Sequence, residues 1–357
     1  TNMYINFTKL ILLVIIILVV YLNTYQIDNY DSIPIEREND NIDLKSEIHY
    51  DLVHTLHKDN TYKKIFFDIF IKNSELFIII PVYTMETDII DDIVVSMYLH
   101  TPEKNVSITS KKILDLNNVI KKNPDTSAKY SEPIIILIYH IECYNELVKI
   151  NFQYKNLEKD YTIFNNSRNL FRLKDTDFKD NTKFKLTLTT LLKDDYIYFD
   201  LFYNYYLDQG VEYFYIYYNG TVNDKIKTIL NKPNVKIIEW DYQYWNDDSV
   251  ENKLFHHAQT GQIHHALYKY GKDSSEYMIF CDLDEYLLSP HRKLDQMINS
   301  KKDSYIFFNV LSKFVGSIPK KFPNRIIISE EKFMYKNRSK CIHNLNSVEY
   351  LNIHYCS

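Results

Sequence analysis

Residues 277–286 of this 357-residue chain read YMIFCDLDEY, an apolar run that ends in two acidic residues one position apart. The apolar part predicts a buried β-strand. Because side chains alternate along a strand, Asp282 and Asp284 are expected on the same side. Two carboxylates placed together repel each other unless a cation or solvent separates them. A divalent ion that bridges diphosphate oxygens is one reason for such a pair, and a solvated acidic turn is the plainer alternative.

Strands and helices alternate along the chain from Phe184 up to this stretch. We expect strands at 185–192, 211–218 and 235–240, and helices at 194–208, 223–230 and 254–270. This alternation predicts an α/β fold, with a parallel sheet covered by helices on both faces. Ligands in such folds bind outside the carboxyl ends of the strands, which is where Asn219 and the Asp282/Asp284 pair are expected.

The composition excludes some classes of protein. The 42 Lys and Arg residues are outnumbered by 47 Asp and Glu, so no basic excess is available to neutralise a nucleic acid. There are five glycines, and none precedes Gly210. The clustered glycines of a phosphate-binding loop are therefore absent. If the chain binds a nucleotide, a metal and side chains must supply the compensating charge.

The amino-terminal segment predicts a membrane anchor. Lys9 precedes an unbroken apolar run from Leu10 to Leu22, and acidic residues follow it. This asymmetry predicts a retained signal anchor in a single-pass type II protein, with the bulk of the chain on the luminal side. We expect four parts: a cytoplasmic tail and signal anchor (1–24), a stem (25–43), a smaller β-rich accessory domain (44–183) and a catalytic domain (184–357).

Sequons and cysteines are compatible with a luminal location. Sequons begin at Asn105, Asn165, Asn219 and Asn337, although a chain this rich in Asn contains several by chance. Cys341 and Cys356 could form a disulfide in an oxidising compartment, whereas Cys281, inside the apolar strand, is expected to be a buried thiol.

Four segments occur together in an informative order. They are residues 195–219, Gly261-Gln262, residues 282–286 and residues 340–354. Their order and spacing resemble glycosyltransferase family 92 and the related family-2-like enzymes with an Asp-x-Asp-Glu-aromatic motif. The resemblance covers about 184–354. It implies a GT-A fold with a mixed, mostly parallel sheet flanked by helices, a nucleotide-sugar donor (a UDP-sugar above all), a divalent metal (Mn²⁺ or Mg²⁺) and inversion at the anomeric carbon.

The resemblance also implies roles for individual residues at the carboxyl ends of the strands. Asp284 and His354 would ligate the metal, Asp282 would bind the ribose or assist the metal, Glu285 and Gln262 would line the donor pocket, Asn219 would lie beside the nucleotide, and Lys340 would pair with diphosphate charge. One departure is Lys193-Asp194-Asp195, which stands where the family usually has Arg-Asn-Glu.

The catalytic base and the function class are left with alternatives. An inverting transfer needs a carboxylate to deprotonate the acceptor hydroxyl. Asp303, Glu330 and Glu331 are candidates that the sequence does not distinguish, and Asp241, Asp247 and Asp248 are similarly open. His264 and His265 are candidates to face the donor pocket, because both lie next to Gln262.

We therefore predict a metal-dependent glycosyltransferase that moves a sugar to a glycan or glycoprotein acceptor. The main alternative is a non-catalytic, membrane-anchored surface glycoprotein with a relic GT-A domain. A haloacid-dehalogenase phosphatase also places Asp-x-Asp after an apolar strand, but it needs Thr or Val at the position of Tyr286 and a longer chain beyond the motif.

Overall fold

The computed structural model describes part of the chain. Backbone is described for residues 15–17, 42–43, 53–55, 62–64, 67–72, 75–81, 93–99, 105–106, 111–115, 134–140, 148–154, 157–163, 183–242, 244, 257–289, 291–299, 301–314, 326–328 and 334–351. Side chains are described for residues 67–72, 75–80, 134, 136–140, 151, 183–242, 244, 258–289, 291–299, 301–308 and 339–351.

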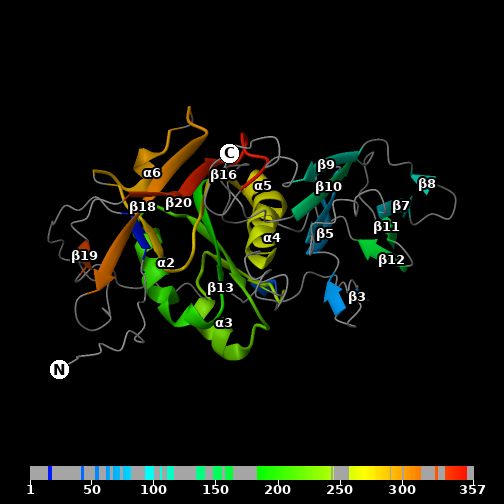
Figure 1. Cartoon of the computed structure of the whole chain (residues 1–357), viewed down its shortest axis with the longest axis horizontal. Helices are drawn as coiled ribbons and strands as arrows, with labels where there is room; N and C mark the ends of the chain where they lie inside the picture. Colours follow the sequence, from blue (N-terminus) through cyan, green and yellow to red (C-terminus); the bar gives the residue numbers. More distant parts are fainter. Residues whose placement is uncertain are drawn as a thin grey trace, which may run out of the picture.

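Four parallel strands form the centre of the main sheet (Figure 1). In spatial order they are β16 (Ser275–Phe280), β13 (Phe184–Leu192), β14 (Tyr213–Tyr218) and β15 (Val235–Glu239). These are the strands that the alternating sequence pattern predicts. The α/β class is therefore confirmed.

Antiparallel strands extend the same sheet beyond β16. They are β20 (Met334–Asn344), β18 (Ser304–Phe314) and β19 (Ile326–Ile328). The sheet also includes β17 (Glu285–Leu287), β1 (Ile15–Ile17) and, parallel to β15, β2 (Ile42–Asp43). The sheet is thus mixed, as predicted.

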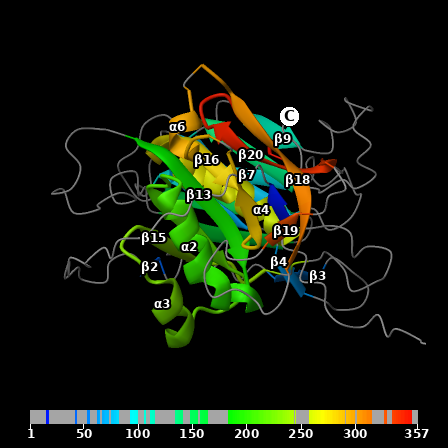
Figure 2. The same ribbon diagram turned by 90° about the vertical axis from the view of Figure 1, so that its left-hand side faces the viewer.

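Helices cover both faces of the central strands (Figures 1 and 2). One face carries the 3₁₀ helix η3 (Asp194–Tyr198), α2 (Phe199–Asp208) and α3 (Asp224–Leu230). The other carries α4 (His257–His265), which continues into the π-helix η4 (Ala266–Gly271) and the short α5 (Lys272–Ser274). A further short helix, α6 (Leu294–Met297), follows β17.

Side-chain alternation along the strands explains the two helical layers. On β14, Phe214 and Ile216 pack in the core with α2 and α3, whereas Tyr215 and Tyr217 pack in the core with α4. Both sets are buried, as expected for a parallel strand covered on both faces. At the end of α2, Gly210 adopts φ 88°, a left-handed conformation that favours glycine and ends the helix.

Every element described between residues 53 and 163 is a strand. One sheet has the order β5 (Asp68–Lys72), β6 (Glu75–Pro81), β10 (Ile134–His140) and β9 (Lys111–Asp115). A second has the order β12 (Leu157–Ile163), β11 (Val148–Tyr154), β7 (Ile93–Leu99) and β8 (Asn105–Val106), and β3 (Val53–Thr55) pairs with β4 (Tyr62–Lys64). The first sheet packs against α4 and η4 through Phe70, Phe77 and Ile138. We call it the accessory sheet.

The predicted membrane anchor lies outside the described residues, apart from β1. Ile15–Ile17 pair there with β17 in parallel and with β18 in antiparallel orientation. In the part of the chain that the structure describes, no helix is both long enough and apolar enough to cross a membrane.

Candidate functional site

The carboxyl ends of the four parallel strands meet at one edge of the main sheet. Backbone hydrogen bonds join neighbouring ends: Asn219 donates to the Leu192 carbonyl at 2.8 Å, and Trp240 donates to the Tyr218 carbonyl at 2.8 Å. Asp282 follows β16 at the same edge. The sheet therefore brings together segments that are far apart in the sequence, at the place where such folds bind ligands.

Asp282 and Asp284 lie in a turn and not in a strand. Strand β16 ends at Phe280, and the Glu285 N–H donates to the Asp282 carbonyl at 3.1 Å. The Glu285 carboxylate turns back and accepts a hydrogen bond from the Asp282 N–H at 2.9 Å. The expected strand alternation is thus wrong, because Glu285 closes the turn. Asp282 is half-buried, whereas Asp284 is exposed.

Lys340, on β20, is the cation of this site. Its Nζ lies 3.0 Å from the Asp282 carboxylate and 3.1 Å from the Glu285 carboxylate. Its side chain is 2% exposed, because β20 pairs directly with β16. Burial alone would lower the pKa of Lys340, but the two carboxylates outweigh it and raise that pKa. The ammonium group therefore stays charged.

Gln259, in the first half of α4, holds the other oxygen of Asp282. Its side-chain amide donates to Asp282 Oδ1, while Lys340 binds Oδ2. The Tyr244 hydroxyl donates to the Gln259 Oε1 at 3.2 Å. The sequence directs attention to Gln262, one helical turn further on, and misses Gln259. The rotation of α4 decides between the two, and no local pattern reveals it.

The site carries more acidic than basic groups. We define the edge cluster as Asp195, Asp282, Asp284, Glu285 and Lys340. Burial of its carboxyl group and the nearby Asp282 raise the pKa of Asp284 to about 6, even though the residue as a whole is exposed. Burial and Asp282 also raise the pKa of Asp195, whose carboxylate accepts from the Lys193 N–H at 3.1 Å. The edge cluster thus combines four acidic residues with one basic residue.

The carboxylates of the edge cluster fit part of a metal site. Carboxylate oxygens are the ligands that Mg²⁺ and Mn²⁺ prefer. Within the described residues, however, no three His, Cys, Asp or Glu side chains are close enough to hold one ion together. The predicted third ligand, His354, lies outside those residues. Asp282 and Asp284 are thus suitable donors whose partner is not described.

Asn219 and Gln262 are buried in structural contacts. The Asn219 amide donates to the carbonyls of Trp240 at 2.9 Å and Tyr242 at 2.8 Å, and so fixes the segment after β15. With this amide nitrogen engaged and buried, the sequon at Asn219 is not accessible in the folded chain. Gln262 is 1% exposed and donates to the Thr189 hydroxyl at 2.6 Å. Neither side chain contacts the edge cluster through these bonds.

Of the candidate bases, Asp303 is described and is not brought to the edge cluster. Asp303 directly precedes β18. Ser304, the first residue of β18, pairs with His343 of β20, and His343 pairs in turn with Met278 of β16. Asp303 is therefore about 15 Å from the level of Asp282 along the strands. Glu330 and Glu331 lie outside the described residues.

His264 does not face the edge cluster. Its Nδ1–H donates to the Thr260 carbonyl at 2.8 Å, and its Nε2 accepts from the Leu351 N–H at 3.2 Å. Burial lowers its pKa to about 4, which keeps the ring neutral. His264 therefore holds the segment that leads towards His354. Cys281 is a buried free thiol, as expected, and Cys341 is disulfide-bonded to a residue outside the described ones.

His265 belongs to a second charged group, between α4 and the accessory sheet. We define the interface cluster as Asp68, Tyr217, His265 and Lys269. The Asp68 carboxylate accepts from His265 Nε2 at 2.8 Å and from Lys269 at 2.6 Å. The Tyr217 hydroxyl lies 2.7 Å from His265 Nδ1. All four residues are buried.

Packing also joins the accessory sheet to α4. A Cβ atom on Gly261 would lie 2.4 Å from the Phe67 ring, so only glycine allows this approach. Phe67 stacks on Trp240 with 5.3 Å between ring centroids, and the Tyr242 hydroxyl donates to the Phe67 carbonyl. The position of α4 is thus set from both sides.

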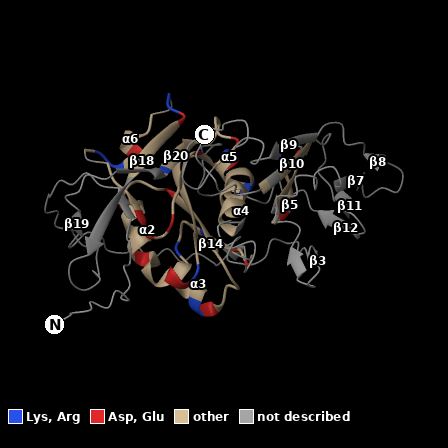
Figure 3. Cartoon of the chain, in the orientation of Figure 1, with Lys and Arg blue, Asp and Glu red and all other residues tan. Residues whose placement is uncertain are grey.

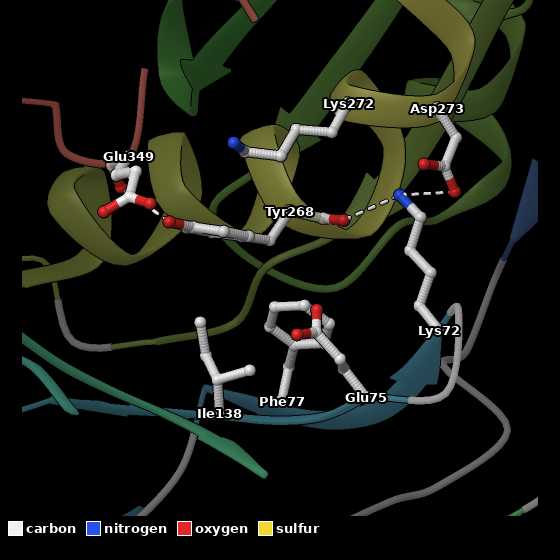
Figure 4. A pocket seen from close by; sticks show the side chains of 8 residues that line it. All are labelled: Lys72, Glu75, Phe77, Ile138, Tyr268, Lys272, Asp273 and Glu349. Carbon is white, nitrogen blue, oxygen red and sulfur yellow. Dashed lines mark hydrogen bonds and ion pairs between the residues drawn. The ribbon is translucent and has the colours of Figure 1, made fainter. Parts of the chain in front are cut away.

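A cavity of about 210 Å³ lies between the accessory sheet and η4 (Figure 4). Beside it, Lys72 extends from β5 to the Tyr268 carbonyl at 2.8 Å and to the Asp273 carboxylate at 3.0 Å. Asp273 precedes β16, so this cavity lies towards the amino end of that strand, away from Asp282. We assign it no part in the site.

Residues 190–357 match the model of glycosyltransferase family 92. The match confirms the family that the sequence motifs indicate, and it supports a glycosyltransferase. Comparisons with curated proteins and with solved structures gave no significant match.

Proposed function

We propose that the glycosyltransferase family 92 domain at residues 190–357 transfers a sugar from a nucleotide-sugar donor to a glycan or glycoprotein acceptor. The observation that carries the proposal is the charge of the edge cluster, in which Asp282 and Glu285 share the Lys340 ammonium group and Asp195 and Asp284 lie near enough to Asp282 for it to raise their pKa values. Such an edge favours a cation, and a cation is what a departing nucleoside diphosphate needs. Figure 3 shows both signs of charge on α3, the helix that carries Asp224 and Lys227.

Each residue of the edge cluster has a role in this proposal. Asp282, held by Gln259 and Lys340, has a side chain that is 35% exposed and would accept hydrogen bonds from donor hydroxyls. Asp284, exposed beside it, would hold Mn²⁺ or Mg²⁺ together with His354. The ion would supply positive charge to the diphosphate leaving group. Lys340 would add to the positive potential near that group, although its direct contacts are with Asp282 and Glu285.

Inversion at the anomeric carbon requires a base on the acceptor side. Since Asp303 lies towards the other end of the strands, Glu330 and Glu331 are the candidates tested first among the carboxylates that follow the acidic motif. Glu330→Gln and Glu331→Gln, tested separately, distinguish them. The variant that lacks the base should retain UDP binding and lose sugar transfer.

The proposed compartment is the lumen of the secretory pathway, reached through the amino-terminal anchor. Support comes from the sequence asymmetry around residues 10–22 and from the disulfide at Cys341. Expression in secretory cells tests it: a glycosidase-sensitive mass shift is expected from Asn105, Asn165 or Asn337. A chain without any attached glycan, soluble in the cytosol, contradicts it.

Calorimetric titration of UDP with and without Mn²⁺ tests the proposed activity. We expect binding that depends on Mn²⁺, followed by Mn²⁺-dependent hydrolysis of at least one sugar in a panel of nucleotide-sugars. A folded chain that neither binds UDP with the metal nor hydrolyses any donor would instead fit the non-catalytic surface glycoprotein.

A further inference from the structure

We infer that Gln259 is a positioning residue for the proposed sugar transfer, because its amide fixes the orientation of the Asp282 carboxylate against the donor. The inference rests on the proposed function and assigns a role to a residue outside the acidic motif. Gln259 is 7% exposed and belongs to α4, whereas Asp282 follows β16.

Both oxygens of Asp282 are held from the protein side. Gln259 donates to Oδ1, and Lys340 Nζ lies 3.0 Å from Oδ2. The two donors come from different elements, α4 and β20, so the carboxylate plane cannot rotate without breaking one of the two bonds.

Stability alone does not account for the bond between Gln259 and Asp282. The Asp282 side chain is 35% exposed, so water would solvate it if Gln259 were absent. It also has an ion pair with Lys340, which is shared between Asp282 and Glu285. What Gln259 adds is a second point of attachment, at Oδ1, that sets the direction of the carboxylate. A fixed carboxylate loses less entropy when a donor hydroxyl binds to it.

The element that carries Gln259 is rigid. Gly261, two residues on, lies against Phe67 with no room for a side chain. His265 is bound to Asp68 at 2.8 Å. The Trp240 indole N–H donates to the Ala258 carbonyl at 2.9 Å, which fixes the residue next to Gln259. A positioning side chain needs such support, because a small misplacement costs activity.

The test compares Gln259→Met with Gln209→Met. Methionine preserves length but cannot donate a hydrogen bond. Gln209, at the end of α2, donates to the neighbouring Asp208 carboxylate at 3.3 Å, so it offers the same amide–carboxylate bond away from the edge cluster. We expect Gln259→Met to lower kcat/KM for the donor by about 10- to 100-fold, mainly through the donor KM. The acceptor KM should stay unchanged, and Gln209→Met should match the wild type in donor KM.

Gln259→Glu supplies a second measurement if the methionine variant does not fold. It has the same shape, and its carboxylate still accepts from Tyr244. It regains a donor only when protonated, so its activity relative to wild type should rise as the pH falls. A relative profile that is flat with pH overturns the inference, as does a Gln259→Met variant with the wild-type donor KM.

The two failures are distinguishable. If the wild type neither binds UDP with Mn²⁺ nor turns over any nucleotide-sugar, the proposed function is wrong and the role of Gln259 is wrong with it. If the wild type is active and the Gln259 variants equal it, only the positioning role is wrong.

Discussion

Helix α4 contacts a group of charged side chains near each of its ends. Near its start, Gln259 binds Asp282 of the edge cluster. At its end, His265 binds Asp68 of the interface cluster. Both clusters contain a carboxylate, a lysine and a further polar partner, so the sequence offers little to separate them. Their protonation behaviour is nonetheless opposite.

The direction of the pKa shift separates the two clusters. In the edge cluster, burial and the neighbouring Asp282 raise the pKa of Asp284 to about 6. In the interface cluster, burial alone would raise the pKa of Asp68, but Lys269 and His265 reverse this and lower it to about 2. Asp68 is thus fully satisfied by the protein.

The comparison shows how a structural ion cluster differs from a site that is ready for a ligand. In the interface cluster two side-chain donors, His265 and Lys269, bind a single carboxylate, whereas in the edge cluster two carboxylates share one lysine. The first arrangement stabilises the contact between the accessory sheet and α4. The second favours a further cation and remains partly open to solvent.

Asp284→Asn is the strongest test of this difference. The substitution removes a negative charge from the edge cluster, so donor turnover should fall on the order of 10³-fold, as when a group that stabilises developing charge is lost. The fold should be retained, because Asp284 is exposed. Mn²⁺-dependent donor hydrolysis and Tm on the same sample measure both effects. Turnover that survives the substitution refutes the assignment of the metal ligand.

Asp68→Asn should have the reverse effect. The variant leaves Lys269 buried without its carboxylate, a change that costs about 3–5 kcal/mol of the free energy of unfolding. Donor KM for the protein that remains folded should be unchanged. Denaturant unfolding measures the loss, and the double variant Asp68→Asn/Lys269→Met should recover part of it. If the loss of unfolding free energy in the double variant equals the sum of the losses in Asp68→Asn and Lys269→Met, the two side chains are not coupled.

The sequence predicted the central sheet well, because each parallel strand is a short apolar run between helices. The strand expected at 185–192 is β13, and the one expected at 235–240 is β15, with limits that differ by one residue. The acidic edge was also predictable, since Asp282 and Asp284 interrupt apolar sequence at a strand end.

The partners of these carboxylates were not predictable. Asp68 and His265 are 197 positions apart, and nothing local links them. The choice between Gln259 and Gln262 depends on the rotation of α4, which Phe67 sets from the accessory sheet by packing on Gly261. Both are long-range effects, and a pattern of nearby residues does not contain them.

The pH dependence of the two clusters should differ in sign. Because the pKa of Asp284 is raised from 3.8 to about 6, its ionisation destabilises the folded state without a ligand, and this part of the stability is lost as the pH rises through that window. Mn²⁺-dependent UDP affinity should conversely fall up to about tenfold per pH unit below 6, as protons compete with the ion. For Asp68, lowered from 3.8 to about 2, stability is lost as the pH falls through that lower window.

Titration of UDP with Mn²⁺ between pH 5 and pH 8, chosen as a range around about 6, checks the first sign. Asp284→Asn serves as the control, because a side chain that does not ionise should abolish this component of the pH dependence. An affinity for UDP that is unchanged across the range contradicts a metal-binding Asp284.

Tyr217→Phe should give the smallest effect and the sharpest distinction. The substitution removes only the hydroxyl that faces His265 Nδ1 at 2.7 Å, and it leaves the buried ring in place. One lost hydrogen bond costs about 1 kcal/mol, which denaturant unfolding can resolve. Donor turnover should not change, since Tyr217 belongs to the interface cluster, which lies at the opposite end of α4 from Gln259. If Tyr217→Phe instead raises the donor KM as Gln259→Met is expected to do, the two ends of α4 are coupled, and the interface cluster takes part in donor binding.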